Sequence, residues 1–164
     1  MATVSMANAS TRTKHPTRGG NVRVPYVVEF ELNLATAATS KGSALAAADV
    51  IECIRIPADT VVLFAGFEIK TAVTGGTSDQ AITLGDGVDP NRWVDTFDLD
   101  AAAAGAHGTI VIATANPTAF ATTDTIDVVI TAATTVATAG VIRVYACMVD
   151  VGDAAAPGLA ALAS

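Results

Sequence analysis

The sequence predicts a single all-β domain, and three observations carry this prediction. Short apolar runs recur along the 164 residues and are separated by turns rich in Gly, Pro and Asp. The clearest run alternates apolar and polar side chains with a period of two, which is typical of a strand with one buried face. No stretch has a convincing amphipathic helical period. Segments with this spacing favour a β-sandwich or barrel.

The composition fits one folded domain with an acidic body. Apolar residues make up 51% of the chain and charged residues 15%, which suffices for a core at this length. Residues 1–25 hold four bases and no acid, whereas the rest holds five bases against sixteen acids, a net charge of −11. An acidic body repels nucleic acid and anionic membranes, so we expect neither as a partner, but a short basic segment can bind an acidic surface.

The chain divides into three parts. Residues 1–20 are rich in Ser, Thr and Asn, show neither the strand nor the helix period, and are expected to form an extended basic arm. Residues 21–152 are expected to form the sandwich. Residues 153–164, which contain Pro and Gly, are expected to be a loosely held tail.

About eight strands are expected. The first begins at Tyr26, where one face is apolar, with Tyr26, Val28, Phe30, Leu32 and Leu34, and alternates with Val27, Glu29, Glu31 and Asn33. Gly66 indicates a bulge or bend within a longer strand. Residues 35–48 fit either a loop or a short helix, and the sequence does not separate the two. In chain order the expected strands cover residues 26–34, 50–56, 61–73, 81–84, 92–97, 109–114, 125–131 and 141–151.

The last of these strands is apolar on nearly every position. Both faces of residues 141–151 carry apolar side chains, namely Val, Ile, Tyr, Ala, Cys and Met. Arg143 is the charged residue within the run. A strand that is apolar on both sides is usually covered on both sides. We therefore expect it to be central in its sheet, or covered by a neighbouring subunit.

No catalytic constellation is visible. The only histidines are His15, in the arm, and His107, in a loop, and neither lies in a nucleophile or metal motif. The common nucleotide, hydrolase and zinc signatures are absent. Cys53 and Cys147 lie far apart in strand-like runs and are expected to be buried reduced thiols. The sequence predicts no enzyme and no cofactor.

One loop gathers oxygen ligands. Asp86 and Asp89, followed by Asn91 and Asp95, suit Ca²⁺ by chemistry, but the spacing does not complete an EF-hand. Asp-Gly and Asp-Pro-Asn are also turn formers, and Trp93 is expected to pack beneath the turn. The turn is the better interpretation, so no metal is expected, with Asp86 and Asp89 as the weak calcium candidates.

A membrane span is not expected. Residues 101–123 are long enough to cross a bilayer and contain no Asp, Glu, Lys or Arg, but Gly, His, Asn and Pro interrupt them.

Four phrases of the sequence resemble small head proteins of tailed bacteriophages. The likeness covers roughly residues 50–151. The phrases that carry it are Ile54-Arg55-Ile56-Pro57-Ala58-Asp59-Thr60-Val61-Val62, Leu84-Gly85-Asp86-Gly87-Val88-Asp89-Pro90-Asn91-Arg92-Trp93, Asp124-Thr125-Ile126-Asp127-Val128 and Gly140-Val141-Ile142-Arg143-Val144-Tyr145-Ala146.

The resemblance implies a capsid decoration, or cement, protein. Such proteins have a jelly-roll-like antiparallel β-sandwich and often form trimers on the outer capsid surface. It implies a homotrimer that binds the major capsid protein in the virion, after assembly in the host cytoplasm. Arg12, Lys14 and Arg18 of the arm are then the candidate capsid contacts.

Two other classes remain open from the sequence. One is a receptor- or glycan-binding module displayed on a virion, which would use exposed loops such as residues 86–93. The other is a trimeric jelly-roll enzyme such as a nucleotide hydrolase, which the lack of an active-site motif disfavours.

Overall fold

The chain folds into two curled β-sheets that pack face to face. The computed structural model describes residues 2–8, 24–77, 79–100, 102–108 and 119–152. Over these residues there are nine strands and one helix. The elements are β1 (Thr3–Asn8), β2 (Tyr26–Asn33), α1 (Leu34–Lys41), β3 (Val50–Ile56), β4 (Thr60–Thr74), β5 (Ala81–Gly85), β6 (Val94–Asp98), β7 (Ala119–Phe120), β8 (Asp124–Ala132) and β9 (Ala139–Asp150).

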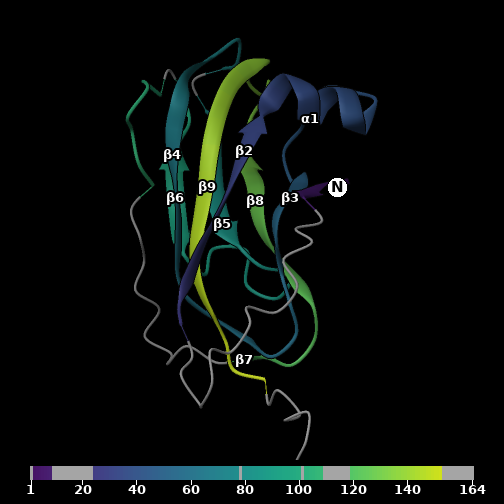
Figure 1. Ribbon diagram of the computed structural model, residues 1–164. Coiled ribbons are helices and arrows are strands. Elements are labelled where there is room, and N and C mark those ends of the chain that lie inside the picture. The colour runs from purple at the N-terminus through teal and green to yellow at the C-terminus, as the bar shows by residue number, and fades with distance from the viewer. Residues whose placement is uncertain (1, 9–23, 78, 101, 109–118, 153–164) are drawn as a thin grey trace, which may run out of the picture.

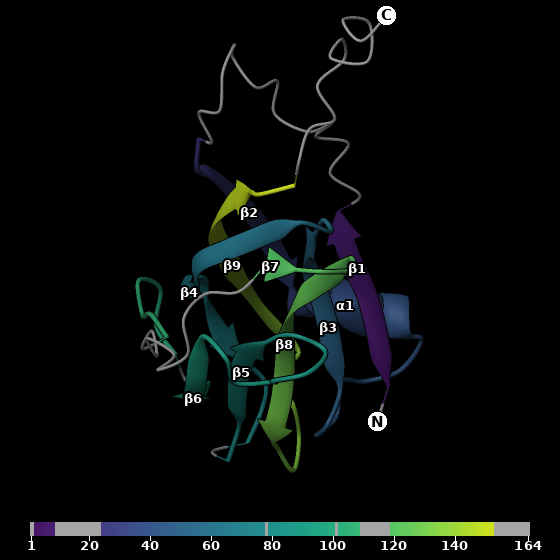
Figure 2. The same ribbon diagram turned by 90° about the horizontal axis from the view of Figure 1, so that it is seen from below.

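The strand order makes this a jelly-roll-like sandwich. Sheet A has the order β1-β3-β8-β5-β6, and sheet B has the order β2-β9-β4-β7. Figure 1 shows β2, β9 and β4 side by side in front of the strands of sheet A, and Figure 2 shows the two layers from below. The expected all-β sandwich is confirmed.

β9 occupies the position that its sequence predicts. It lies between β2 and β4 and pairs antiparallel with both. Its pairing with β2 runs without a register shift from Tyr26 opposite Met148 to Asn33 opposite Val141. A strand flanked on both edges and packed on the core has little contact with water, which explains its nearly continuous apolar sequence.

β4 carries the irregularities of sheet B. Its register against β9 shifts between Val62 and Phe64, earlier than the bend expected at Gly66. Gly66 serves packing instead, because a Cβ there would lie 2.9 Å from the Tyr145 hydroxyl oxygen. A side chain larger than hydrogen would therefore displace the Tyr145 ring.

The segment left open between loop and helix forms α1. The Asn33 side chain accepts a hydrogen bond from the Thr36 amide at 3.2 Å and caps the helix start. Gly42, with φ of 77°, ends the helix and donates its amide to the carbonyls of Ala38 and Thr39.

The beginning of the expected arm belongs to the sandwich. Residues 3–8 form β1, which pairs parallel with β3 at the edge of sheet A. The Val50 amide donates to the Ala2 carbonyl, and Val4 is buried. The polar composition of residues 1–20 hid this strand, because its partner is supplied from far along the chain. The strand expected at 109–114 and the tail at 153–164 lie outside the described residues.

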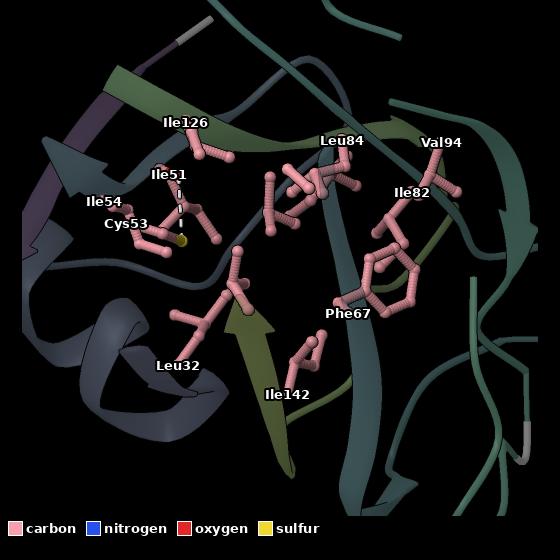
Figure 3. Packing of buried hydrophobic residues seen from close by; sticks show 14 of the residues in the cluster. Leu32, Ile51, Cys53, Ile54, Phe67, Ile82, Leu84, Val94, Ile126 and Ile142 are labelled. Carbon is pink, nitrogen blue, oxygen red and sulfur yellow. Dashed lines mark hydrogen bonds between the residues drawn. The ribbon is translucent and has the colours of Figure 1, made fainter. Parts of the chain in front are cut away.

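The core lies between the two sheets. Phe67 of β4 meets Phe97 of β6 edge to face, with ring centroids 5.1 Å apart, and so joins sheet B to sheet A. Figure 3 shows side chains from both sheets interleaving in this layer: Leu32, Ile51, Cys53, Ile54, Phe67, Ile82, Leu84, Val94, Ile126 and Ile142.

Candidate functional site

The loop between β5 and β6, residues 86–93, folds back over the outer face of sheet A. A Cβ on Gly85 would lie only 2.0 Å from the Asp89 carbonyl oxygen, so only glycine permits this approach. The Thr83 hydroxyl, on the same face, donates to the Pro90 carbonyl at 2.7 Å. Figure 2 shows the loop crossing β8. The loop is thus fastened to the sheet by backbone contacts.

Asp86 organises this loop from within. Its Oδ1 accepts the amides of Val88 at 3.0 Å and Asp89 at 2.8 Å, and its own amide donates to the Asp89 carbonyl at 2.9 Å. Its Oδ2 lies 2.5 Å from Arg92 Nε, and the Asp86 side chain is fully buried. The Arg92 guanidinium lies 6.0 Å from the centre of the Trp93 ring.

The carboxylates of Asp86 and Asp89, the weak calcium candidates, have partners within the loop. Oδ1 of Asp86 accepts two amides of the loop, whereas its Oδ2 forms an ion pair with Arg92 without a hydrogen bond in the described structure. Asp89 Oδ1 accepts the Asn91 amide at 3.4 Å. Within the described residues, no three His, Cys, Asp or Glu side chains are grouped to hold a metal ion. Asp86 and Asp89 thus both accept amides from within their own turn. Trp93 is buried at the end of the loop, where its amide donates to the Leu84 carbonyl.

A buried carboxyl lies beside this loop. Asp127 of β8 is 3% exposed, and in the described structure its Oδ1 has no hydrogen-bond partner. Its register partners are Glu52 on β3 and Gly85 on β5. Burial raises the pKa of Asp127 to about 7, the negative charges of Glu52, Asp124 and Asp86 add to the rise, and a hydrogen bond from the Thr125 side chain opposes it.

Sequence reasoning missed Asp127. The alternation of β8 places it on the outer face of sheet A, where a carboxylate is ordinarily solvated. Only the return of residues 86–93 over that face buries it. A weak signal was present, since Gly-Asp-Gly next to Asp-Pro-Asn indicated a tight loop, but the strand that the loop would cover was not predictable.

The outer face of sheet B presents a different surface. Val27 is 62% exposed, Leu63 44% and Phe64 43%. Val27 and Phe64 lie on either side of Cys147 in register, so they form one apolar row across β2, β9 and β4. We call Val27, Leu63, Phe64 and Cys147 the apolar row.

Charged side chains occupy the other end of the same face. Glu31 of β2, Arg143 of β9 and Glu68 of β4 stand in register. Arg143 Nη1 lies 3.4 Å from Glu68 Oε1, and Lys70 forms an ion pair with Glu31. The hydrogen bond from Lys70 lowers the pKa of Glu31. This end of sheet B is polar and solvated, in contrast to the apolar row.

His107 is exposed, and its backbone forms an isolated bridge to Glu68 at the edge of β4. Cys53 and Cys147 are both free and buried, as expected. Burial raises the pKa of the Cys53 thiol far above its usual range. Arg12, Lys14, Arg18 and His15 lie outside the described residues.

The one helix among the described residues is too short to cross a bilayer.

Comparison with known proteins gives a likeness of fold. No protein-family model and no curated protein sequence matches the chain. A chain in the capsid of Ralstonia phage GP4 matches with a TM-score of 0.62 and 19% identity, over 90% of this chain and 97% of that one. A chain in the capsid asymmetric unit of cyanophage Pam1 matches with a TM-score of 0.57 and 16% identity, over 88% and 98%. This protein therefore shares the fold of chains found in two phage capsids.

Proposed function

We propose that this protein is a structural component of a bacteriophage virion, acting as a decoration protein on the outer surface of the capsid. The observation that carries the proposal is the fold, which matches chains from two phage capsids along nearly the whole of each. The proposed partners are the major capsid protein and two further copies of the chain in a homotrimer. The role is structural rather than catalytic.

The charge distribution supports the proposed mode of attachment. The body is acidic, while residues 1–25 carry four bases and no acid. Arg12, Lys14 and Arg18 would contact acidic patches on the shell. Binding restricted to the assembled shell would stabilise that shell by mass action, as a ligand stabilises any state that it alone recognises. Contacts of this kind weaken as salt screens them.

The test is co-sedimentation of the purified chain with emptied heads of the virus that encodes it, over a salt series. Deleting residues 1–20 would also remove β1, so the informative variant is the triple substitution Arg12→Gln, Lys14→Gln, Arg18→Gln. We expect the parent to bind and to bind less as salt rises, and the triple variant to bind weakly at all salt concentrations. The control for loss of a positive charge outside the arm is Arg55→Gln, an exposed base on β3 of sheet A.

Light scattering coupled to gel filtration tests the trimer separately. A parent chain that ignores the shells would overturn the decoration role. Equal binding by the parent and the triple variant would instead overturn only the role of the arm.

A further inference from the structure

We propose that the proton on the buried Asp127 carboxyl controls how firmly the loop of residues 86–93 closes on sheet A, and that the loop opens more readily once this proton is lost. The inference concerns the loop and its sheet alone and does not depend on a role in the virion.

The geometry places the carboxyl under the loop. Gly85 and Asp127 are register partners on neighbouring strands, so their side-chain positions share one face of sheet A. On that face the Gly85 position is filled by backbone atoms of Asp89 and Pro90. A Cβ added at Gly87 would lie 3.3 Å from Asp124 Oδ1, so this part of the loop also lies close to β8. The loop therefore covers the part of β8 that carries Asp127, and Asp127 is 3% exposed as a result.

The charged groups around Asp127 are mostly acids. Glu52 stands opposite it on β3, Asp124 lies on its own strand, and Asp86 faces it from the loop. Among the neighbouring cations, Arg92 is paired with Asp86, and Arg55 of β3 is exposed and opposite Thr125 rather than Asp127. β5 contributes no titratable side chain here.

The consequence of losing the proton follows from this arrangement. A protonated Asp127 is neutral and can stay buried beside three carboxylates. An ionised Asp127 is stabilised by a hydrogen bond from the Thr125 side chain, but the cost of burial is larger. Its Oδ1 has no hydrogen-bond partner in the described structure, and the carboxylate meets repulsion from Glu52, Asp124 and Asp86. Lifting the loop admits water to the carboxylate and relieves this cost. The open form is therefore favoured as pH rises, up to the point where the closed form has also lost its proton.

Amide hydrogen exchange measures the opening directly. The Trp93 amide at the end of the loop donates to the Leu84 carbonyl of β5, so it is released to exchange when the loop lifts from sheet A. Because the pKa of Asp127 is raised to about 7, we expect the protection factor of this amide to fall at least tenfold between about pH 5 and pH 7, and to level off above it.

Three variants make the test specific. Asp127→Asn keeps the shape of the neutral carboxyl, so we expect its protection factors to stay constant over this range. Glu52→Gln removes one repelling charge and should reduce the fall. Glu29→Gln, on the exposed face of sheet B, should behave like the parent.

Trp93 supplies a second readout. It is the single Trp of the chain and lies buried at the end of the loop, so acrylamide quenching of its fluorescence should rise with pH in the parent and not in Asp127→Asn. Protection factors that do not change with pH in the parent would overturn the inference. So would the same fall in the parent and in Asp127→Asn.

Discussion

The outer faces of the two sheets differ in what lies on them. On sheet A, residues 86–93 lie across β5 and β8 and bury Asp86 and Asp127. On sheet B, the described chain leaves Val27, Leu63 and Phe64 more than two-fifths exposed at one end of the outer face, and a ladder of charged side chains lies at the other end. One face is sealed by the chain's own loop and is polar underneath, and the other is open and partly apolar.

This difference separates two uses of a β-sandwich. A sealed face constrains its own sequence, because buried polar groups there must find partners within the chain. An open face with an apolar row is free for contact with another surface, and surfaces of that kind mark association sites when they are contiguous. Partner contacts of the proposed virion role therefore fit sheet B better than sheet A.

The largest expected effect compares two phenylalanines on one strand. Phe67 of β4 is fully buried against Phe97, whereas Phe64 is 43% exposed on the outer face. We expect Phe67→Ala to lower the free energy of unfolding by about 3–5 kcal/mol and Phe64→Ala by under about 1 kcal/mol. Urea denaturation followed by circular dichroism measures both. Similar losses for the two variants would mean that Phe64 is covered in solution.

The next comparison removes one cation from each face. Arg92→Met leaves the fully buried Asp86 carboxylate without its ion-pair partner, so we expect a loss of about 2–3 kcal/mol. Lys70→Met breaks the ion pair with Glu31, which is exposed, and should cost under about 0.5 kcal/mol. The same denaturation experiment measures the difference. An equal cost would show that the loop does not hold Asp86 away from water.

Two glycines, Gly85 at the end of β5 and Gly87 in the loop, test how closely the loop lies against sheet A. Gly85→Ala would bring a methyl group within 2.0 Å of the Asp89 carbonyl oxygen, so the loop must lift, at a cost of about 2 kcal/mol. Gly87→Ala meets only the Asp124 carboxylate, at 3.3 Å, and should cost less than half as much. Thermal unfolding measures the order of the two. The reverse order would contradict the close approach at Gly85.

The smallest expected effect depends on pH. The raised pKa of Asp127 means that the folded state holds a proton that the unfolded state releases, so the stability from this group is present below the ordinary Asp pKa and is lost as pH rises through about 7. Asp127→Asn should therefore match the parent near pH 4 and exceed its stability at pH 8 by about 1–2 kcal/mol, after allowance for solvent screening. Denaturation midpoints at the two pH values measure this. A variant that is less stable than the parent at pH 8 would contradict it.

The elements that could be predicted are those whose own pattern of apolar residues indicates which side is buried. β2 alternates with a period of two, and β9 is apolar on both faces, so their existence and the central place of β9 followed from the sequence. β1 could not be found in this way, because Thr, Ser and Asn surround its buried Val4 and its partner β3 begins 47 positions later at Val50. The helix at residues 34–41 begins at the cap formed by Asn33, a residue type that favours turns as well as helix starts, so the sequence alone did not separate the two.

The candidate site divides in the same way. That Asp86 would form a turn was predictable from the residues that follow it, since Asp-Gly and Asp-Pro favour turns on local grounds. The burial of Asp127 depends on where that turn comes to rest, and this is set by the absence of a side chain at Gly85, forty-two positions earlier. The residues around Asp127 therefore do not indicate that it is buried, because the burial comes from a distant segment of the chain.

The position of β9 also bears on how the chain is made. The two strands beside it in sheet B, β2 and β4, are synthesised before it. The backbone N–H and C=O groups on their facing edges can pair only after residues 139–150 have left the ribosome. Sheet B is therefore completed only late in synthesis, through contacts between residues as distant as Tyr26 and Met148. Until then the nascent chain exposes unpaired strand edges, which makes its yield sensitive to chaperones and to the rate of translation.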